Sequence, residues 1–142
     1  MSADGFFAAS SSELCASILD HLRSNDTLFA ALGDPVRLYD DQVREPYYPY
    51  AVLERHETTD RSVSERRCFE HQMQFATFSR YGGLREAKSV LGRIRMAIEN
   101  LTLTLSQQRV VLIIPTYCDV MRSQNQQIFR GVLRIRIHTE EI

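Results

Sequence analysis

The sequence lacks any apolar run long enough to cross a lipid bilayer, and it has no repeat or tract of biased composition. These absences exclude a helical membrane span and a low-complexity chain. The first residues, Met1 to Phe7, contain no basic segment and only a very short apolar run. We therefore expect no signal peptide and synthesis in the cytoplasm.

Cysteine is scarce, and its spacing carries no metal signature. The three residues Cys15, Cys68 and Cys118 form an odd set without a CxxC pair or a Cys/His ligand pattern. Neither a disulfide framework nor a zinc site is implied. We expect all three to be reduced thiols that behave as small hydrophobic side chains.

The strong catalytic and cofactor motifs are also missing. The sequence contains no GxSxG elbow, P-loop, GxGxxG turn, HExxH helix or EF-hand loop. We therefore predict no enzyme, no cofactor and no metal. Gly82-Gly83 is interpreted as the turn between a strand and a helix, in preference to a phosphate-binding loop.

Two weaker patterns in the sequence involve acidic residues and histidines. Asp40, Asp41 and Glu45 are either paired carboxylates or a solvated acidic loop, and we favour the loop because no nucleophile or further ligand lies nearby in the sequence. Histidines occur at four separated positions, never at ligand spacing, and are expected on surfaces or sheet faces: His21, His56, His71 and His138.

What the sequence does have is the composition of one folded domain. The 142 residues are 44% hydrophobic and 25% charged, with a net charge of -1, so no global basic field favours nucleic acid. Residues 1–60 hold four basic and eleven acidic residues, whereas residues 61–142 hold thirteen basic and seven acidic ones. This split indicates either neutralisation between the two halves or complementary faces that dock copy onto copy, and we favour the first.

The first half of the chain predicts helices followed by strands. Ser10 and Glu13 have capping-box spacing before a helix over about residues 12–23, which makes residues 1–12 a flexible leader and 13–142 a single domain. A helical turn at 27–32 ends at Gly33, and a short strand follows at 36–39. Strands are predicted at 50–57 and 66–80, joined by a long polar connection, residues 58–65, that we expect to project and move.

The second half repeats the order of a helix followed by strands. Apolar residues at spacings of three and four predict an amphipathic helix from Leu84 to Leu101, with Arg85, Lys88, Arg93 and Arg95 off the apolar stripe. Strands follow at 109–120 and 128–138. The fold class is therefore α+β, with a mostly antiparallel sheet of four to five strands and two main helices packed on one face.

Arginines on the last strand form the clearest charged face. Arg130, Arg134 and Arg136 alternate with buried positions, which suits phosphate contact or pairing with acidic residues. Phe129 is the only aromatic residue close by in the sequence, and it is out of phase with the arginines. We therefore favour pairing with the acidic N-terminal half and keep a small nucleic-acid-binding module as an alternative.

Several segments, taken in order, resemble one family. They are Leu28-Phe29-Ala30-Ala31-Leu32-Gly33, Pro46-Tyr47-Tyr48-Pro49-Tyr50-Ala51-Val52-Leu53, His71-Gln72-Met73-Gln74-Phe75, the helix from Leu84, and Phe129-Arg130-Gly131-Val132-Leu133-Arg134. Their order and spacing, from Leu14 to Ile137, resemble the tail completion or tail terminator proteins of long-tailed bacteriophages and phage-like gene transfer agents. Phe78 stands where relatives often have tryptophan.

The resemblance implies a structural protein of the virion, assembled in the bacterial host cytoplasm. Such proteins form a ring, typically a hexamer, at the head-proximal end of the tail tube, where they stop polymerisation and join tail to head. The implied partners are further copies of the chain, the tail tube protein and the head-tail connector or stopper protein, with DNA only in transit and no membrane. A head completion or stopper role at the same junction is the nearest alternative.

Two sets of residues are expected to make contacts in such an assembly. The polar connection supplies a loop for the tail tube or connector, comprising Arg61, Glu65, Arg66 and Arg67. The arginine face, Arg130, Arg134 and Arg136, is expected to be a subunit interface or a face lining the channel.

Overall fold

The computed structural model describes residues 3–80, 83–123 and 127–142. Helix α1 (Ala3–Arg23) and helix α2 (Asp26–Leu32) precede the short strand β1 (Leu38–Tyr39) and the long strands β2 (Tyr50–Asp60) and β3 (Cys68–Ser79). Helix α3 (Gly83–Glu99) is followed by strands β4 (Gln108–Arg122) and β5 (Phe129–Glu141). No helix in these described ranges is long and apolar enough to span a membrane.

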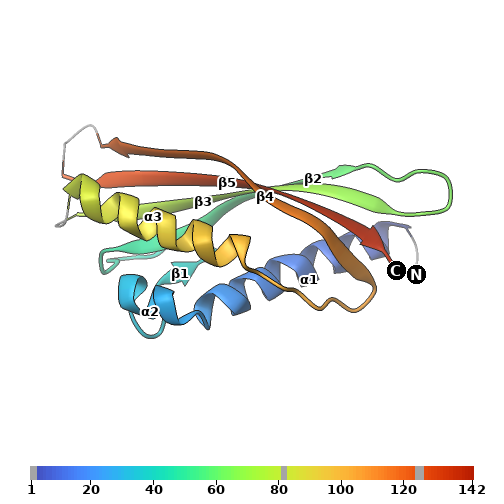
Figure 1. The fold of residues 1–142 in the computed structure, drawn as a ribbon, viewed down its shortest axis with the longest axis horizontal. Coiled ribbons are helices and arrows are strands. Elements are labelled where there is room, and N and C mark those ends of the chain that lie inside the picture. The colour runs from blue at the N-terminus through green and yellow to red at the C-terminus, as the bar shows by residue number, and fades with distance from the viewer. Residues whose placement is uncertain (1–2, 81–82, 124–126) are drawn as a thin grey trace.

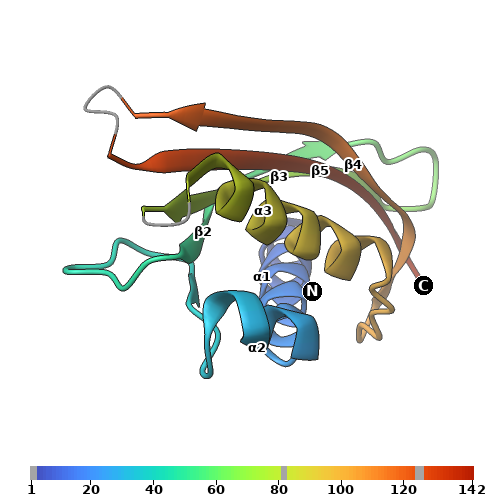
Figure 2. The same ribbon diagram turned by 60° about the vertical axis from the view of Figure 1, so that its left-hand side comes forward.

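The five strands form one sheet in the order β1-β2-β3-β5-β4. Only β1 and β2 are parallel, and the other neighbours are antiparallel. All three helices lie against the same face of the sheet and leave the other face open (Figures 1 and 2). The predicted α+β class with a mostly antiparallel sheet is therefore confirmed.

The core lies between the sheet and the helices. Along β5, Leu133, Ile135 and Ile137 are buried against the helices, as period-two alternation predicts. Helix α3 contributes the apolar stripe read from the sequence, which includes Val90, Leu91, Ile94 and Ile98. Gly131 lets β5 lie close to Thr77 of β3 and Leu91 of α3, because a Cβ at this position would collide with Thr77 Oγ1 and touch Leu91.

Helix α1 corrects the prediction of a start near residue 12. It begins at Ala3, and Phe6 and Ser10 are buried. The Phe6 ring stacks on Phe69 at a centroid distance of 6.1 Å, so tertiary packing stabilises a turn that has weak helical propensity of its own. The expected capping box is wrong, since Ser10 Oγ donates to the carbonyl of Phe7 and Glu13 accepts from the Ser106 amide.

Helix α2 follows its local signals. Asn25 caps the N-terminus by accepting from the Thr27 amide at 2.9 Å, and Gly33 ends the helix with φ of 85°. The predicted turn at 27–32 is therefore confirmed, starting one residue earlier.

Strand β4 forms one long edge of the sheet. Two bulges interrupt its pairing with β5, at Val110/Leu112 and at Pro115/Tyr117. Pro115 lies within the strand, where it contributes no N–H group.

Candidate assembly surfaces

The β2–β3 hairpin reaches farther from helix α2 than any other labelled part of the chain (Figure 1). The predicted connection over residues 58–65 is too long, because Thr58 and Thr59 pair with His71 and Glu70 and extend β2 to Asp60. Both threonines are β-branched and suit a strand. A bridge between Val63 and Arg66 closes the tip, where residues 61–66 are all exposed.

Three of the four predicted loop residues form ion pairs at the base of this tip. Arg61 donates to Glu70 at 3.1 Å, Arg66 lies 3.5 Å from Glu140, and Arg67 lies 3.8 Å from Glu141. Arg67 also lies over the Phe6 ring, 4.8 Å from its centroid. These contacts fix the base of the hairpin against β3, β5 and α1, so the tip is presented in a defined direction.

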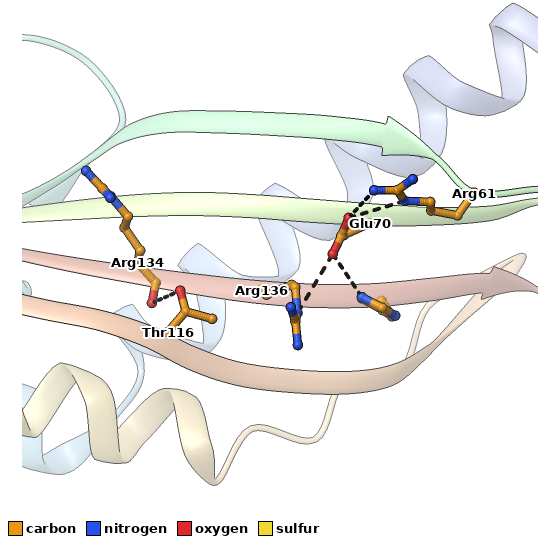
Figure 3. A network of polar contacts seen from close by, with 6 residues as sticks. Arg61, Glu70, Thr116, Arg134 and Arg136 are labelled. Atoms are coloured by element: carbon orange, nitrogen blue, oxygen red, sulfur yellow. Dashed lines mark hydrogen bonds and ion pairs between the residues drawn. The ribbon is translucent and has the colours of Figure 1, made fainter.

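The arginine face lies on the side of the sheet that no helix covers. Arg136 Nε and His138 Nε2 lie 3.8 and 3.3 Å from Oε1 of Glu70, and the other oxygen, Oε2, accepts from Arg61 (Figure 3). These hydrogen bonds, from Arg61 first and then from His138, lower the pKa of Glu70. Glu70 is thus the shared acceptor that links the hairpin base to β5.

The other two predicted arginines have partners of different kinds. Arg130 pairs with Glu54 at 2.5 Å, and Arg134 donates to Gln74 at 2.8 Å while its guanidinium lies over the Tyr117 ring. The preference for pairing with the N-terminal half therefore holds for Arg130 alone, since Glu70 and Gln74 belong to the second half. Carboxylates therefore face Arg130 and Arg136, whereas Arg134 lies against an amide and an aromatic ring.

Aromatic residues do accompany the arginines, which sequence alone did not indicate. Strand register places Phe78 opposite Arg130 and Tyr50 opposite Phe78, with the Tyr50 and Phe78 rings stacked at 4.9 Å. Together with Tyr48 and Met121 they line an open groove of about 610 Å³. Only cross-strand register, which periodicity along one strand does not reveal, brings these residues together.

The histidines are not all isolated. His56 and His71 lie in hydrogen-bond contact under the hairpin base, whereas His21 is exposed on α1 and His138 lies by Glu70. Burial lowers the pKa of both His56 and His71, in His71 to about 4, and nearby His56 and His138 add to that shift. Within the described ranges, no three His, Cys, Asp or Glu side chains gather in a way that could hold a metal ion.

The fold and these surfaces describe a small subunit with one open sheet face and a projecting hairpin. A family model described as "Tail completion protein gp17" matches residues 16–140, so the chain belongs to the tail completion protein family. Membership makes it a structural component of a phage-type virion that associates with other virion proteins. The resemblance predicted from the sequence is confirmed.

A solved structure shows the same fold. A chain of the "Virion of native gene transfer agent (GTA) particle" superposes with a TM-score of 0.81 at 22% sequence identity. The match covers 91% of this chain and 96% of the other. The search of curated proteins found no match.

Proposed function

We propose that six copies of the chain form a ring at the head-proximal end of the tail tube, which ends tube polymerisation and joins the tail to the head. The observation that carries this proposal is the tail completion family match over residues 16–140. The architecture supports it, because the connected ends of β2 and β3 project from one end of the subunit, beyond the part of the sheet that the helices cover (Figure 1). The role involves no catalytic step.

The hairpin tip is the proposed contact with the tail tube or with the head-tail connector. Glu65 and the outward parts of Arg61, Arg66 and Arg67 are the polar groups that it offers. Protein contacts at such a rim depend on several charges together, because each exposed charge contributes little alone. Arg130, Arg134 and Arg136 are proposed to face a neighbouring subunit or the channel through which DNA passes.

Electron microscopy of particles produced without this gene tests the role. Full heads lying apart from tubes of irregular or excessive length are the expected result. Tails of correct length that fail to join would instead assign the chain to a head completion or stopper role on the other side of the junction. Intact, functional tailed particles would contradict both roles.

A shortened hairpin tests the contact. Replacing residues 62–67 with Asn-Gly closes Arg61 onto Cys68 through a two-residue turn and keeps the strand register. We expect the isolated subunit to keep its circular dichroism spectrum but to lose joining of tails to heads. A full-length variant with Glu65→Gln alone serves as the control and should still join them.

The stacked Tyr50 and Phe78 rings beside Arg130 favour one alternative, a module that binds single-stranded nucleic acid. The pairing of Arg130 with Glu54 opposes it, because the carboxylate of Glu54 competes with phosphates for this guanidinium. Oligonucleotide binding that weakens steeply with salt and is lost in Phe78→Ala would support this alternative.

A further inference from the structure

The charge split between the two halves of the chain is not neutralised inside the subunit, contrary to the prediction. Among the described residues, the ion pairs of Arg61, Arg66, Arg67, Arg109 and Arg136 all involve carboxylates of residues 61–142. Only the pair of Arg130 with Glu54 joins the two halves in that part of the chain. Apart from Glu54 and Glu57, the described carboxylates of the first half form no ion pair with a described cation of the subunit.

An arginine-lined cleft of about 580 Å³ opens between α2 and the first half of α3. We call it the arginine cleft, and its three basic side chains are Arg37, Arg85 and Arg93. None of the three forms an ion pair with a described carboxylate. Arg37 Nε donates to the Pro49 carbonyl at 2.9 Å and Arg93 donates to the Thr27 carbonyl at 3.2 Å, so backbone groups hold these side chains without neutralising them.

The arginine cleft is shaped for carboxylates. Glu86 is the single acidic residue that lines it, and one of its oxygens is taken by the Ser79 hydroxyl at 3.0 Å. The cleft thus holds more positive than negative charge. The planar fork of a guanidinium matches a carboxylate, and a partly enclosed cleft strengthens such a pair relative to open solvent.

The same chain carries an unmatched acidic segment. Asp40, Asp41 and Glu45 are exposed in the loop between β1 and β2, and none lies within ion-pair distance of a described cation. This loop, turquoise in Figure 2, extends away from α2 and α3, so it does not close over the arginine cleft of its own subunit. We call residues 40–45 the acidic loop; it also contains Arg44, so its three carboxylates and one cation leave it with a net negative charge.

We propose that the acidic loop of one copy enters the arginine cleft of the next copy. The inference rests on the proposed ring and names the contact that builds it. The two surfaces are different parts of one chain, so each copy offers a loop to one neighbour and a cleft to the other. Such heterologous contacts add copies in one direction and close into a ring when the rotation between neighbours allows it.

Cysteine cross-linking between copies tests the contact directly. Gln42→Cys in the acidic loop and Ser89→Cys in the arginine cleft are combined with Cys118→Ser, which removes the exposed native thiol. Treatment of assembled particles and of concentrated purified chain with a short bismaleimide should give a ladder of covalent oligomers. Variants that carry only one of the two introduced cysteines, and that also keep Cys15 and Cys68, are the controls, and a ladder equal to that of these controls would overturn the proposal.

Charge exchange identifies the occupant of the cleft. Asp40→Arg with Asp41→Arg should lower the cross-linked fraction about tenfold, and so should Arg85→Glu with Arg93→Glu. All four changes in one chain should restore the ladder, because the reversed loop then meets a reversed cleft. An unchanged ladder in the loop variant, or a failure of the four changes to restore it, would show that a different acidic protein occupies the cleft and would overturn the proposal.

The cross-link and the gene deletion separate the two claims. A tail defect on deletion without a ladder means that the proposed function holds and the contact is wrong. A ladder with normal tails on deletion means that the contact is right and the proposed tail role is wrong.

Discussion

His56 Nε2 lies 2.8 Å from His71 Nδ1, and the other ring nitrogen of His71 lies 3.1 Å from Thr139 Oγ1. One of the two facing nitrogens must donate and the other must accept, so at least one ring is uncharged. His71 is fully buried, under the part of the sheet that the start of α1 covers. The network joins β2, β3 and β5 at the base of the hairpin, and burial of His71 favours the neutral form of its ring.

Acid should therefore destabilise the subunit through His71. The folded pKa near 4 lies below the unfolded value of about 6.5, so the unfolded chain binds a proton first as the pH falls. The contribution of His71 to the free energy of unfolding is fully present above about pH 6.5 and should fall by about 2 kcal/mol by pH 5. Urea unfolding at several pH values measures the loss. His71→Gln should be less stable at pH 7.5, and its free energy of unfolding should depend less on pH. His21→Gln should keep the steep pH dependence of the unmodified protein. Equal pH dependence in all three proteins would show that His71 does not cause the loss of stability in acid.

The first turns of α1 should be part of the folded core. Phe6 is 5% exposed and its neighbour Phe7 is 43% exposed, although both contact Phe69. We expect Phe6→Ala to cost about 3 kcal/mol and Phe7→Ala less than about 1 kcal/mol in chemical unfolding. Equal, small losses would show that residues 3–12 are dispensable for stability.

Two glycines should respond in opposite ways to alanine. A methyl group at Gly131 would collide with Thr77 Oγ1, so Gly131→Ala should lower stability by about 1–3 kcal/mol. Gly92 lies within α3 with open space around the Cβ position, and Gly92→Ala should raise stability by about 0.5–1 kcal/mol. Thermal unfolding of both variants is the measurement, and a stabilising change at Gly131 would contradict the packing.

The cap of α2 offers a smaller test. Asn25→Ala removes the acceptor of the Thr27 amide and should cost about 1 kcal/mol, whereas Asn25→Asp should stay close to the natural protein. Because α2 forms one wall of the arginine cleft, Asn25→Ala should also reduce cross-linking between copies. Unfolding curves that are identical for both variants would show that the cap contributes nothing.

The sequence predicts those elements whose signal is local. The apolar spacing from Leu84 predicts α3, and the alternation of Leu133, Ile135 and Ile137 predicts β5, because both depend on periodicity within one segment. The start of α1 was missed because Phe6 is stabilised by Phe69, which lies far away in the chain. The extension of β2 through Thr58 and Thr59 was missed because it depends on pairing across the hairpin.

The sequence predicts less about the surfaces than about the fold. Arg134 and Arg136 were correctly placed on one face, but their acceptors Gln74 and Glu70 follow from the register between β3 and β5. The arginine cleft combines residues from α3 with Arg37, which lies just before β1. Sequence spacing showed only that Arg85 and Arg93 lie off the apolar stripe, and it gave no indication that they share a cavity with Arg37.

The exposed edge of β4 affects whether subunits pair through their sheets before assembly. A long edge strand normally offers a row of backbone groups on which a strand from another chain can form a ladder. In β4 the missing amide of Pro115 and the two bulges interrupt that row. The β4 edge therefore offers no continuous template for sheet-to-sheet fibres, and contacts between copies at this edge depend on side chains.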